Sequence, residues 1–260
     1  MGTIAVIPAR YQSERLPGKP LAEIAGEPMV QHVYRRASRA RLVERVLVAT
    51  DDERILRAVE DFGGEAVLTS KDHSSGTDRI AEAVAALEFR DVVNVQGDEP
   101  FVDPDSIDEA IEASRRHEAI ATLKKAIESS DELWNPNVVK VVTDRRGLAL
   151  YFSRWPIPFV ASTGFSDSSL PMSASKGMPT ENHFRHVGLY VYPKHVLLEL
   201  VGRAPTPLER SERLEQLRAL ENGFPIHVEE TTSESLSVDT PADLERARDL
   251  TRKRSQDAPE

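Results

Sequence analysis

The sequence contains no cysteine, which excludes disulfide bonds, thiolate metal sites and cysteine nucleophiles. It also lacks any apolar run close to the roughly 20 residues that a membrane-spanning helix needs. The opening segment, MGTIAVIPAR, is a short apolar run without the basic stretch or the cleavage site of a signal peptide. Such a chain suits a reducing compartment, and we expect a soluble, cytoplasmic protein with no membrane contact.

Basic residues are outnumbered by acidic ones. Lys and Arg number 33 against 43 Asp and Glu, so the formal net charge is −10 at pH 7. Most of such a surface repels a nucleic acid backbone, and a nucleic acid partner is therefore not expected. The sequence also has neither the GxxxxGKS or GxxxxGKT of a P-loop nor the GxGxxG of a dehydrogenase site.

What the chain does contain is an alternation of short Val/Ile-rich runs and amphipathic segments. Its 260 residues, 40% of them hydrophobic, can bury the core of one large domain. In the first half, strands are predicted at residues 3–9, 46–49, 66–68 and 92–96, and helices at 28–40, 51–62, 77–87 and 104–115. This alternation favours an α/β fold, with a mostly parallel sheet and helices on both faces.

The second half has a different pattern. Strands are predicted at residues 120–126, 138–142, 148–152 and 185–192, followed by helices at 207–221 and 241–253. Residues 161–182 are rich in Ser, Gly and Pro and show no period, so this segment is either a lid or a disordered loop. The second half therefore predicts a smaller β-rich sub-lobe.

Ligands of open α/β sheets bind at the carboxyl ends of the strands, which directs attention to the loops after residues 9, 49, 68 and 96, and first to the loop after residue 9. This loop carries three cations, Arg10, Arg15 and Lys19, in an otherwise acidic chain. Guanidinium forks and a compact ammonium suit phosphate oxygens, and Gly18 would let backbone amides approach an anion. Three solvated cations on a surface turn would have the same spacing, so a polyphosphate clamp and a plain turn both stay open.

Two aspartates stand where a metal ion can bind. Asp98 follows a predicted strand, and the next helix has its own cap at Asp103, which leaves Asp98 free of that role. A carboxylate at such a position can hold Mg²⁺, although turn-forming aspartates are common there. Asp239 precedes a helix start whose capping box is complete with Thr240 and Asp243, so its carboxylate is likewise available.

Nine segments taken together carry a family signature. They are PARYQSERLPGKPL, VATDD, DHSSGTDRI, VNVQGDEP, NPNVVKVV, LYFSR, FRHVGLY, LEQLRALENG and VDTPADLERAR. In this order, from residue 3 to about residue 250, they resemble the 3-deoxy-manno-octulosonate (Kdo) cytidylyltransferases, also called CMP-Kdo synthetases. The related sialic acid cytidylyltransferases have a first loop richer in Gly and Lys. The resemblance implies a nucleotide-diphospho-sugar transferase-like fold. It also implies transfer of CMP from CTP to Kdo with release of pyrophosphate, which activates Kdo for lipopolysaccharide synthesis.

The resemblance also implies roles for individual residues. Nucleotide contacts are implied for Pro8, Ala9, Arg10, Ser13, Arg15, Lys19, Ser75, Gly76 and Arg79. Catalytic roles are implied for Lys19, Asp98, Arg15 and Asp239. Of these, Asp98 and Asp239 are implied to hold Mg²⁺. One departure concerns the second of them, because Ser237 stands where family members usually have Gly.

Sugar contacts are implied for Gln96, Arg154, His186, Tyr190, Glu215 and Gln216. Arg154 could pair with the Kdo carboxylate through both arms of its guanidinium. His186 and Tyr190 share one face of a predicted strand, where a satisfied core histidine is the alternative. His183 and His186 lack a third ligand, so a metal pair is not expected.

The resemblance further implies one nucleotidyltransferase domain over residues 1–260. Within it, residues 1–118 would bind CTP, 119–230 would form the sugar-binding and dimerisation sub-lobe, and 231–260 would carry a helix back to the core. The implied partners are small-molecule substrates and a second copy of the chain in a homodimer. Two alternatives stay open: a cytidylyltransferase for a modified acid sugar such as amino-Kdo, and a non-catalytic nucleotide-sugar sensor.

Overall fold

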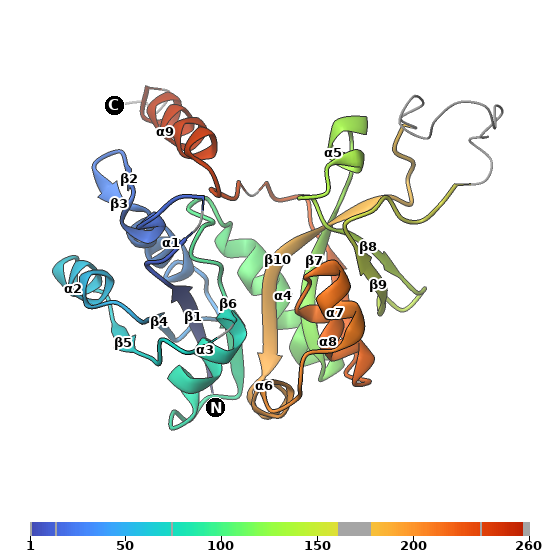
Figure 1. The fold of residues 1–260 in the computed structure, drawn as a ribbon, viewed down its shortest axis with the longest axis horizontal. Helices are drawn as coiled ribbons and strands as arrows, with labels where there is room; N and C mark the ends of the chain where they lie inside the picture. Colours follow the sequence, from blue (N-terminus) through green and yellow to red (C-terminus); the bar gives the residue numbers. More distant parts are fainter. Residues whose placement is uncertain (1, 14, 74, 161–177, 235, 257–260) are drawn as a thin grey trace.

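The computed structural model describes residues 2–13, 15–73, 75–160, 178–234 and 236–256 (Figure 1). The strands of its main sheet are β1 (Thr3–Ala9), β4 (Arg45–Thr50), β5 (Ala66–Leu68), β6 (Asp91–Asn94), β7 (Ile120–Ala126), β8 (Lys140–Thr143), β9 (Ala149–Ser153), β10 (Phe184–Pro193) and β11 (Ile226–Glu230). Their order is β11-β7-β10-β6-β1-β4-β5, and β8 joins at β10 and carries β9. Helices cover both faces of this sheet, so the expected α/β fold is confirmed.

The first half of the chain forms the parallel part of the sheet. β1 pairs in parallel with β4 and β6, and β4 pairs in parallel with β5. β10 lies antiparallel between β6 and β7, and β11 runs parallel to β7. β8 and β9 form an antiparallel hairpin on β10. The strands predicted in the second half are therefore present, as an extension of the same sheet.

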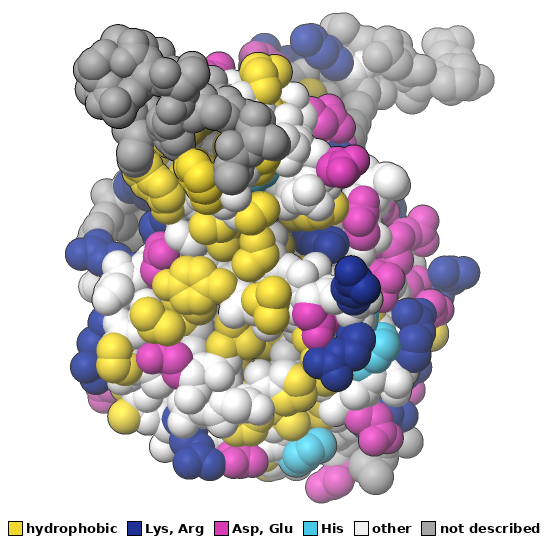
Figure 2. Space-filling model, turned by 90° about the vertical axis from the view of Figure 1, so that its right-hand side faces the viewer, with side chains coloured by type: hydrophobic (Ala, Val, Ile, Leu, Met, Phe, Trp, Pro, Cys, Tyr) yellow, Lys and Arg dark blue, Asp and Glu magenta, His cyan; other side chains and the backbone are white. Residues whose placement is uncertain are grey.

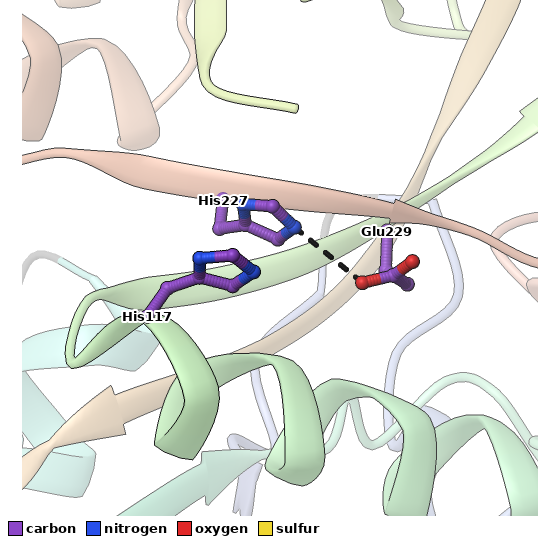
Figure 3. A group of neighbouring side chains, drawn as sticks. All are labelled: His117, His227 and Glu229. Carbon is purple, nitrogen blue, oxygen red and sulfur yellow. Dashed lines mark ion pairs between the residues drawn. The ribbon is translucent and has the colours of Figure 1, made fainter. Parts of the chain in front are cut away.

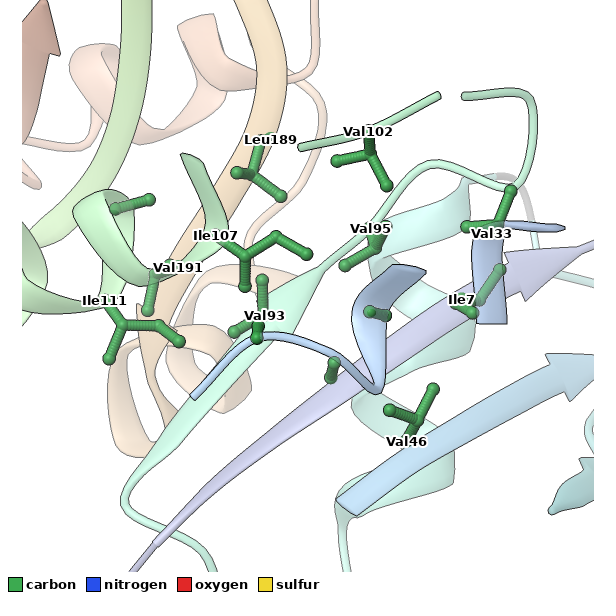
Figure 4. Close-up of a cluster of buried hydrophobic side chains, with 14 of the residues drawn as sticks. Ile7, Val33, Val46, Val93, Val95, Val102, Ile107, Ile111, Leu189 and Val191 are labelled. Carbon is green, nitrogen blue, oxygen red and sulfur yellow. The ribbon is translucent and has the colours of Figure 1, made fainter. Parts of the chain in front are cut away.

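The core lies on both faces of the sheet, which is why β1 is a continuous apolar run. Successive side chains of a strand point to opposite faces. Ala5 and Ile7 accordingly enter one hydrophobic cluster, and Ile4 and Val6 enter the other. Figure 4 shows the first cluster, in which α4 (Pro104–His117) packs its apolar side chains on the strands.

The remaining elements surround the sheet. They are α1 (Met29–Ala37), α2 (Glu53–Asp61), α3 (Gly76–Val84), α5 (Ser130–Trp134), α6 (Lys194–Val201), α7 (Pro207–Glu212), α8 (Gln216–Glu221), α9 (Pro241–Gln256), the 3-10 turn η1 (Lys19–Leu21) and a small hairpin of β2 (Glu23–Ile24) and β3 (Glu27–Pro28). Helices α1, α2 and α4 contribute to the first cluster, and α3, α6 and α8 contribute to the second. No helix in the described part of the chain is both long and apolar enough to cross a membrane.

Some helix predictions were wrong in detail. α2 begins after Asp52, whose side chain accepts the backbone N–H of Arg54, and not after Thr50. The helix predicted at 207–221 is split into α7 and α8, because Arg213 adopts a left-handed φ of 54° that ends α7. α6 begins directly after β10, where the sequence predicted no helix. Of the predicted loop at 161–182, residues 161–177 lie outside the described residues.

Candidate active site

A cavity of about 410 Å³ opens at the carboxyl ends of β1 and β6. It is bounded by the loop after β1, the start of α3, the loop after β6 and the residues just before α8 and α9. The lining residues are Pro8, Ala9, Arg10, Ser13, Arg15, Lys19, Pro20, His73, Ser75, Gly76, Arg79, Gln96, Gly97, Asp98, Glu215 and Asp239. All residues for which a nucleotide contact was predicted are among them. The ends of parallel strands meet at one edge of a sheet, which is why the strand-end rule located this cavity.

The loop after β1 is closed by its own backbone. The N–H of Gly18 donates to the carbonyl oxygen of Tyr11 over 3.0 Å, and Gly18 has a φ of 68°. This left-handed conformation favours glycine, and an added Cβ would also lie 3.3 Å from the Tyr11 ring. Gly18 therefore forms the turn that places Lys19, the first residue of η1, on the cavity wall.

Lys19 lies between two carboxylates that are distant in the sequence. Its Nζ is 2.6 Å from Oδ2 of Asp98 and 3.0 Å from Oδ1 of Asp239. Nη2 of Arg15 lies 3.1 Å from the same oxygen of Asp239. Burial alone would lower the pKa of Lys19, but the charges and hydrogen bonds of the two aspartates outweigh burial and raise that pKa. Lys19 is therefore a fixed cation in the cavity.

The pair of Asp98 and Asp239 also suits a divalent cation. Both carboxylates point at the same spot, marked by the Lys19 ammonium, and they remain 25% and 37% exposed. The N–H of Val238 donates to the carbonyl oxygen of Asp98 over 2.8 Å, which ties the two segments together. Carboxylate oxygens are hard ligands of the kind that Mg²⁺ prefers. The residues present thus fit a magnesium site.

The start of α3 forms a further wall of the cavity. Oγ of Ser75 accepts the backbone N–H of Asp78 over 3.1 Å, so Ser75 caps the helix. Gly76 lies close to β1, because an added Cβ would be 3.4 Å from Cγ of Pro8. The positive end of the helix dipole is therefore close to the end of β1, an arrangement that favours an anionic ligand.

Arg79 lines the cavity, but its guanidinium is engaged by the protein. Nη1 donates to Oγ1 of Thr69 over 2.6 Å, and Nη2 pairs with Oδ2 of Asp51 over 3.0 Å. Asp51 follows β4 in the VATDD segment, and no role was predicted for it. The ion pair holds Arg79 in place and offsets its charge.

Two residues with a predicted sugar contact, Gln96 and Glu215, line the same cavity. Oε2 of Glu215 accepts a hydrogen bond from Oγ1 of Thr77 over 2.8 Å. Tyr190 and Gln216 line a much smaller second pocket, which shares Glu215 with the main cavity.

Arg154 and His186, by contrast, do not line the cavity. Nε of Arg154 donates to the carbonyl of Glu212 over 2.7 Å and Nη1 donates to that of Pro136 over 3.0 Å, so the guanidinium is not presented to a carboxylate ligand. Nε2 of His186 is hydrogen-bonded to Oγ1 of Thr122 over 2.9 Å, and burial lowers the pKa of His186 to about 3. His186 is therefore a half-buried, hydrogen-bonded histidine that stays neutral, as in the alternative given above.

Three lining residues were not predicted from the sequence: Pro20, His73 and Gly97. Gly97 carries a physical signal, because an added Cβ would lie 2.8 Å from the carbonyl oxygen of Pro8. Only glycine allows β1 and the loop after β6 to approach so closely. His73 is hydrogen-bonded to Glu82 and lowers the pKa of that carboxyl. The DHSSGTDRI segment indicated this region without pointing to His73.

Comparison with known sequences identifies relatives along nearly the whole chain. A family model described as cytidylyltransferase matches residues 4–235. A 3-deoxy-manno-octulosonate cytidylyltransferase of Syntrophotalea carbinolica is 53% identical over 248 residues, which cover 95% of this chain and 97% of the relative. A protein of the same name from Geobacter sulfurreducens is 52% identical over 248 residues, covering 95% and 98%.

Solved structures agree with these relatives. A CMP:2-keto-3-deoxy-manno-octonic acid synthetase complexed with CTP has a TM-score of 0.86 and 42% identity, covering 98% of this chain and 100% of the other. A Bacillus anthracis structure described as a glucose-1-phosphate thymidylyltransferase has a TM-score of 0.65 at 14% identity, covering 100% and 97%, and shares the fold alone. On its family match and its identity to these relatives, the chain belongs to the 3-deoxy-manno-octulosonate cytidylyltransferase family.

Proposed function

We propose that this chain transfers CMP from CTP to Kdo, forming CMP-Kdo and pyrophosphate and so activating Kdo for lipopolysaccharide synthesis. Its relatives are named for this activity, and the solved relative at 42% identity holds CTP. Within this chain, the proposal is carried by the cluster of Lys19, Asp98 and Asp239 in the cavity. A cation next to paired carboxylates is the kind of site that phosphoryl-transfer chemistry uses.

The reaction needs no covalent intermediate. The anomeric hydroxyl of Kdo attacks the α-phosphorus of CTP in line and gives up its proton to solvent, and a new O–P bond forms as the bond to the pyrophosphate oxygen breaks. Both substrates are anionic, so positioning and charge neutralisation dominate catalysis. Arg10, Arg15 and Lys19 lie on one loop of the cavity and would bind the triphosphate.

We propose Mg²⁺ as the cofactor, held by Asp98 and Asp239. When bound there, it would supply charge that stabilises the phosphate oxygens. Lys19 stays protonated because its pKa is raised, so its ammonium remains available as a further cation. Arg15 contacts Asp239 over 3.1 Å and can orient that carboxylate.

We place the acid sugar on the side of the cavity formed by Gln96 and Glu215. Gly188 borders this side, because an added Cβ would be in van der Waals contact with it, 3.7 Å from Oε1 of Glu99 and 3.8 Å from Cγ of Gln96. Glu215 is positioned by Thr77 and can accept hydrogen bonds from sugar hydroxyls. These side chains are therefore the proposed determinants of sugar specificity.

Pyrophosphate release from CTP and Mg²⁺ tests the reaction. It is measured with Kdo, with amino-Kdo, with sialic acid and without sugar, and release with Kdo alone is expected. Release with amino-Kdo alone would keep the mechanism and change the substrate. A protein that binds CTP but releases no pyrophosphate with any sugar would contradict the proposal and favour a sensor.

We further propose that the enzyme is a cytoplasmic homodimer. Figure 2 views the side of the molecule on which β8 and β9 lie, and hydrophobic side chains gather across that face. Leu150 on β9 and Trp155 just after it are 63% and 56% exposed. Contiguous exposed apolar surface is typical of subunit interfaces. The cysteine-free sequence also suits a reducing cytoplasm.

A further inference from the structure

Three potential metal ligands meet at a place that the proposed function does not use. Among the described residues, His117, His227 and Glu229 bring one ligand atom each within 4.8 Å of one another. His117 is the last residue of α4, and the other two lie on β11. Figure 3 shows the three side chains grouped together, and none of them lines the active-site cavity.

One pair of ligand atoms already has the spacing found around a coordinated ion. Nε2 of His227 lies 3.4 Å from Oε2 of Glu229. Zinc bonds of about 2.0–2.2 Å in a tetrahedral arrangement place two ligand atoms roughly 3.3 Å apart. The rings of His117 and His227 stack with their centroids 3.6 Å apart and 16° between their planes, so their in-plane lone pairs do not converge in this arrangement, and coordination by both requires the His117 ring to leave the stack. Because His117 is exposed, its ring can turn a nitrogen toward the same point.

The fold already holds two of these ligands in place. Residues two apart on a strand face the same side, so β11 presents His227 and Glu229 together. His227 is buried against Gly147, where an added Cβ would lie 2.7 Å from the ring. Nδ1 of His227 is enclosed without a hydrogen-bond partner in the described part of the chain. Nε2 is the nitrogen that faces Glu229.

The local charge favours a bound cation, although the Arg116 guanidinium competes for one of the ligands. His117 lies at the carboxyl end of α4, where the helix dipole is negative. Nη1 of Arg116 lies 3.2 Å from Oε2 of Glu229, the same oxygen that faces His227. A bound ion would have to displace Arg116 from that oxygen, so removal of the Arg116 charge should strengthen binding.

We propose that His117, His227 and Glu229 form a binding site for Zn²⁺. Two imidazoles and a carboxylate are a common ligand set for this ion, whereas Mg²⁺ prefers oxygen ligands alone. Three protein ligands leave a fourth position for water or another ligand. The site therefore differs in location and in ion from the magnesium site at Asp98 and Asp239.

Titration of the full-length protein with Co²⁺, a visible-absorbing substitute for Zn²⁺, tests the site. Excess Mg²⁺ is present to occupy the carboxylates of the cavity. The wild type should bind one Co²⁺ per chain with a visible absorption band that Zn²⁺ abolishes. His117→Ala and Glu229→Gln should weaken binding at least about tenfold, since loss of even an outer-shell partner costs this much. Arg116→Gln should strengthen it.

His195→Ala is the matched control, because His195 is an exposed histidine on α6. Its Co²⁺ affinity should equal that of the wild type. His117→Ala should fold normally by circular dichroism and keep wild-type turnover in Mg²⁺, since His117 is exposed and outside the cavity. An unchanged Co²⁺ affinity in His117→Ala, or a wild type without the absorption band, would overturn the proposal.

Discussion

Asp98 faces both the proposed metal ion and Lys19, so a single isosteric change there tests the chemistry. Asp98→Asn keeps the side-chain shape and removes the charge that lies 2.6 Å from the ammonium. We expect turnover to fall on the order of 100-fold, as when one preorganised electrostatic contact is lost. The melting temperature should change by no more than about a few degrees, because Lys19 keeps its contact with Asp239 at 3.0 Å. Pyrophosphate release and thermal melting measure the two effects.

Asp105→Asn is the matched control for this change. Asp105 lies exposed in the first turn of α4 and does not line the cavity. Its variant should turn over like the wild type. Near-normal turnover in Asp98→Asn would contradict the assignment of Asp98 to the metal ion.

His186 gives a prediction for stability in acid. Burial lowers its folded-state pKa to about 3, whereas an unfolded histidine titrates near about 6.5. The folded protein therefore binds fewer protons in this window, and stability present above about pH 6.5 is lost as the pH falls toward 3. Between pH 7 and pH 5 the free energy of unfolding, measured with urea, should fall by about 2 kcal/mol more for the wild type than for His186→Gln. If the free energy of unfolding depends on pH in the same way for the wild type and His186→Gln, His186 is not held as a neutral group.

At the scale of elements, the packing of β1 against the loop after β6 positions Asp98. The loop approaches β1 so closely that a Cβ on Gly97 would lie 2.8 Å from the carbonyl oxygen of Pro8. Gly97→Ala must therefore shift the loop and the carboxylate that follows it. We expect turnover to fall about tenfold or more, because small misplacements of a positioned group are costly.

Gly202→Ala controls for the loss of a glycine as such. Gly202 ends α6 with a φ of −74°, and an added Cβ would come no closer than 3.4 Å to another atom. Thermal melting measures the loss of stability in both variants, and steady-state kinetics measure the loss of turnover. If the two variants lose activity equally, the close approach at Gly97 does not position Asp98.

Elements whose structure is determined by neighbouring residues in the chain could be predicted from the sequence. The apolar run of β1 is buried on both faces, and the cap of α4 at Asp103 is present as expected. The break between α7 and α8 could not be predicted, because a left-handed φ at a non-glycine residue such as Arg213 leaves no sequence signal. The place of β10 in the sheet depends on pairs such as Tyr190 and Asn94, which are distant in the chain.

At the scale of the whole molecule, the candidate site likewise has parts that local sequence predicts and parts that depend on the tertiary fold. The strand-end rule predicted that the loop after β1 and the loop after β6 share one edge. No local pattern brings Asp239 to Lys19, since 220 positions separate them, and only the family resemblance implied that both act together. The sequence could not reveal that carbonyl groups engage Arg154, because its partners at Pro136 and Glu212 are set by the tertiary fold.

The apolar face around β9 carries the last prediction, which concerns assembly. Leu150 is 63% exposed on β9, and a charge there should separate a dimer that buries it. The wild type should have twice the mass of one chain in light scattering, and Leu150→Glu should have the mass of one chain with an unchanged circular dichroism spectrum. Leu68→Glu is the control, because Leu68 is 47% exposed at the opposite end of the sheet. A monomeric wild type would contradict the homodimer, and a dimeric Leu150→Glu would move the interface away from β9.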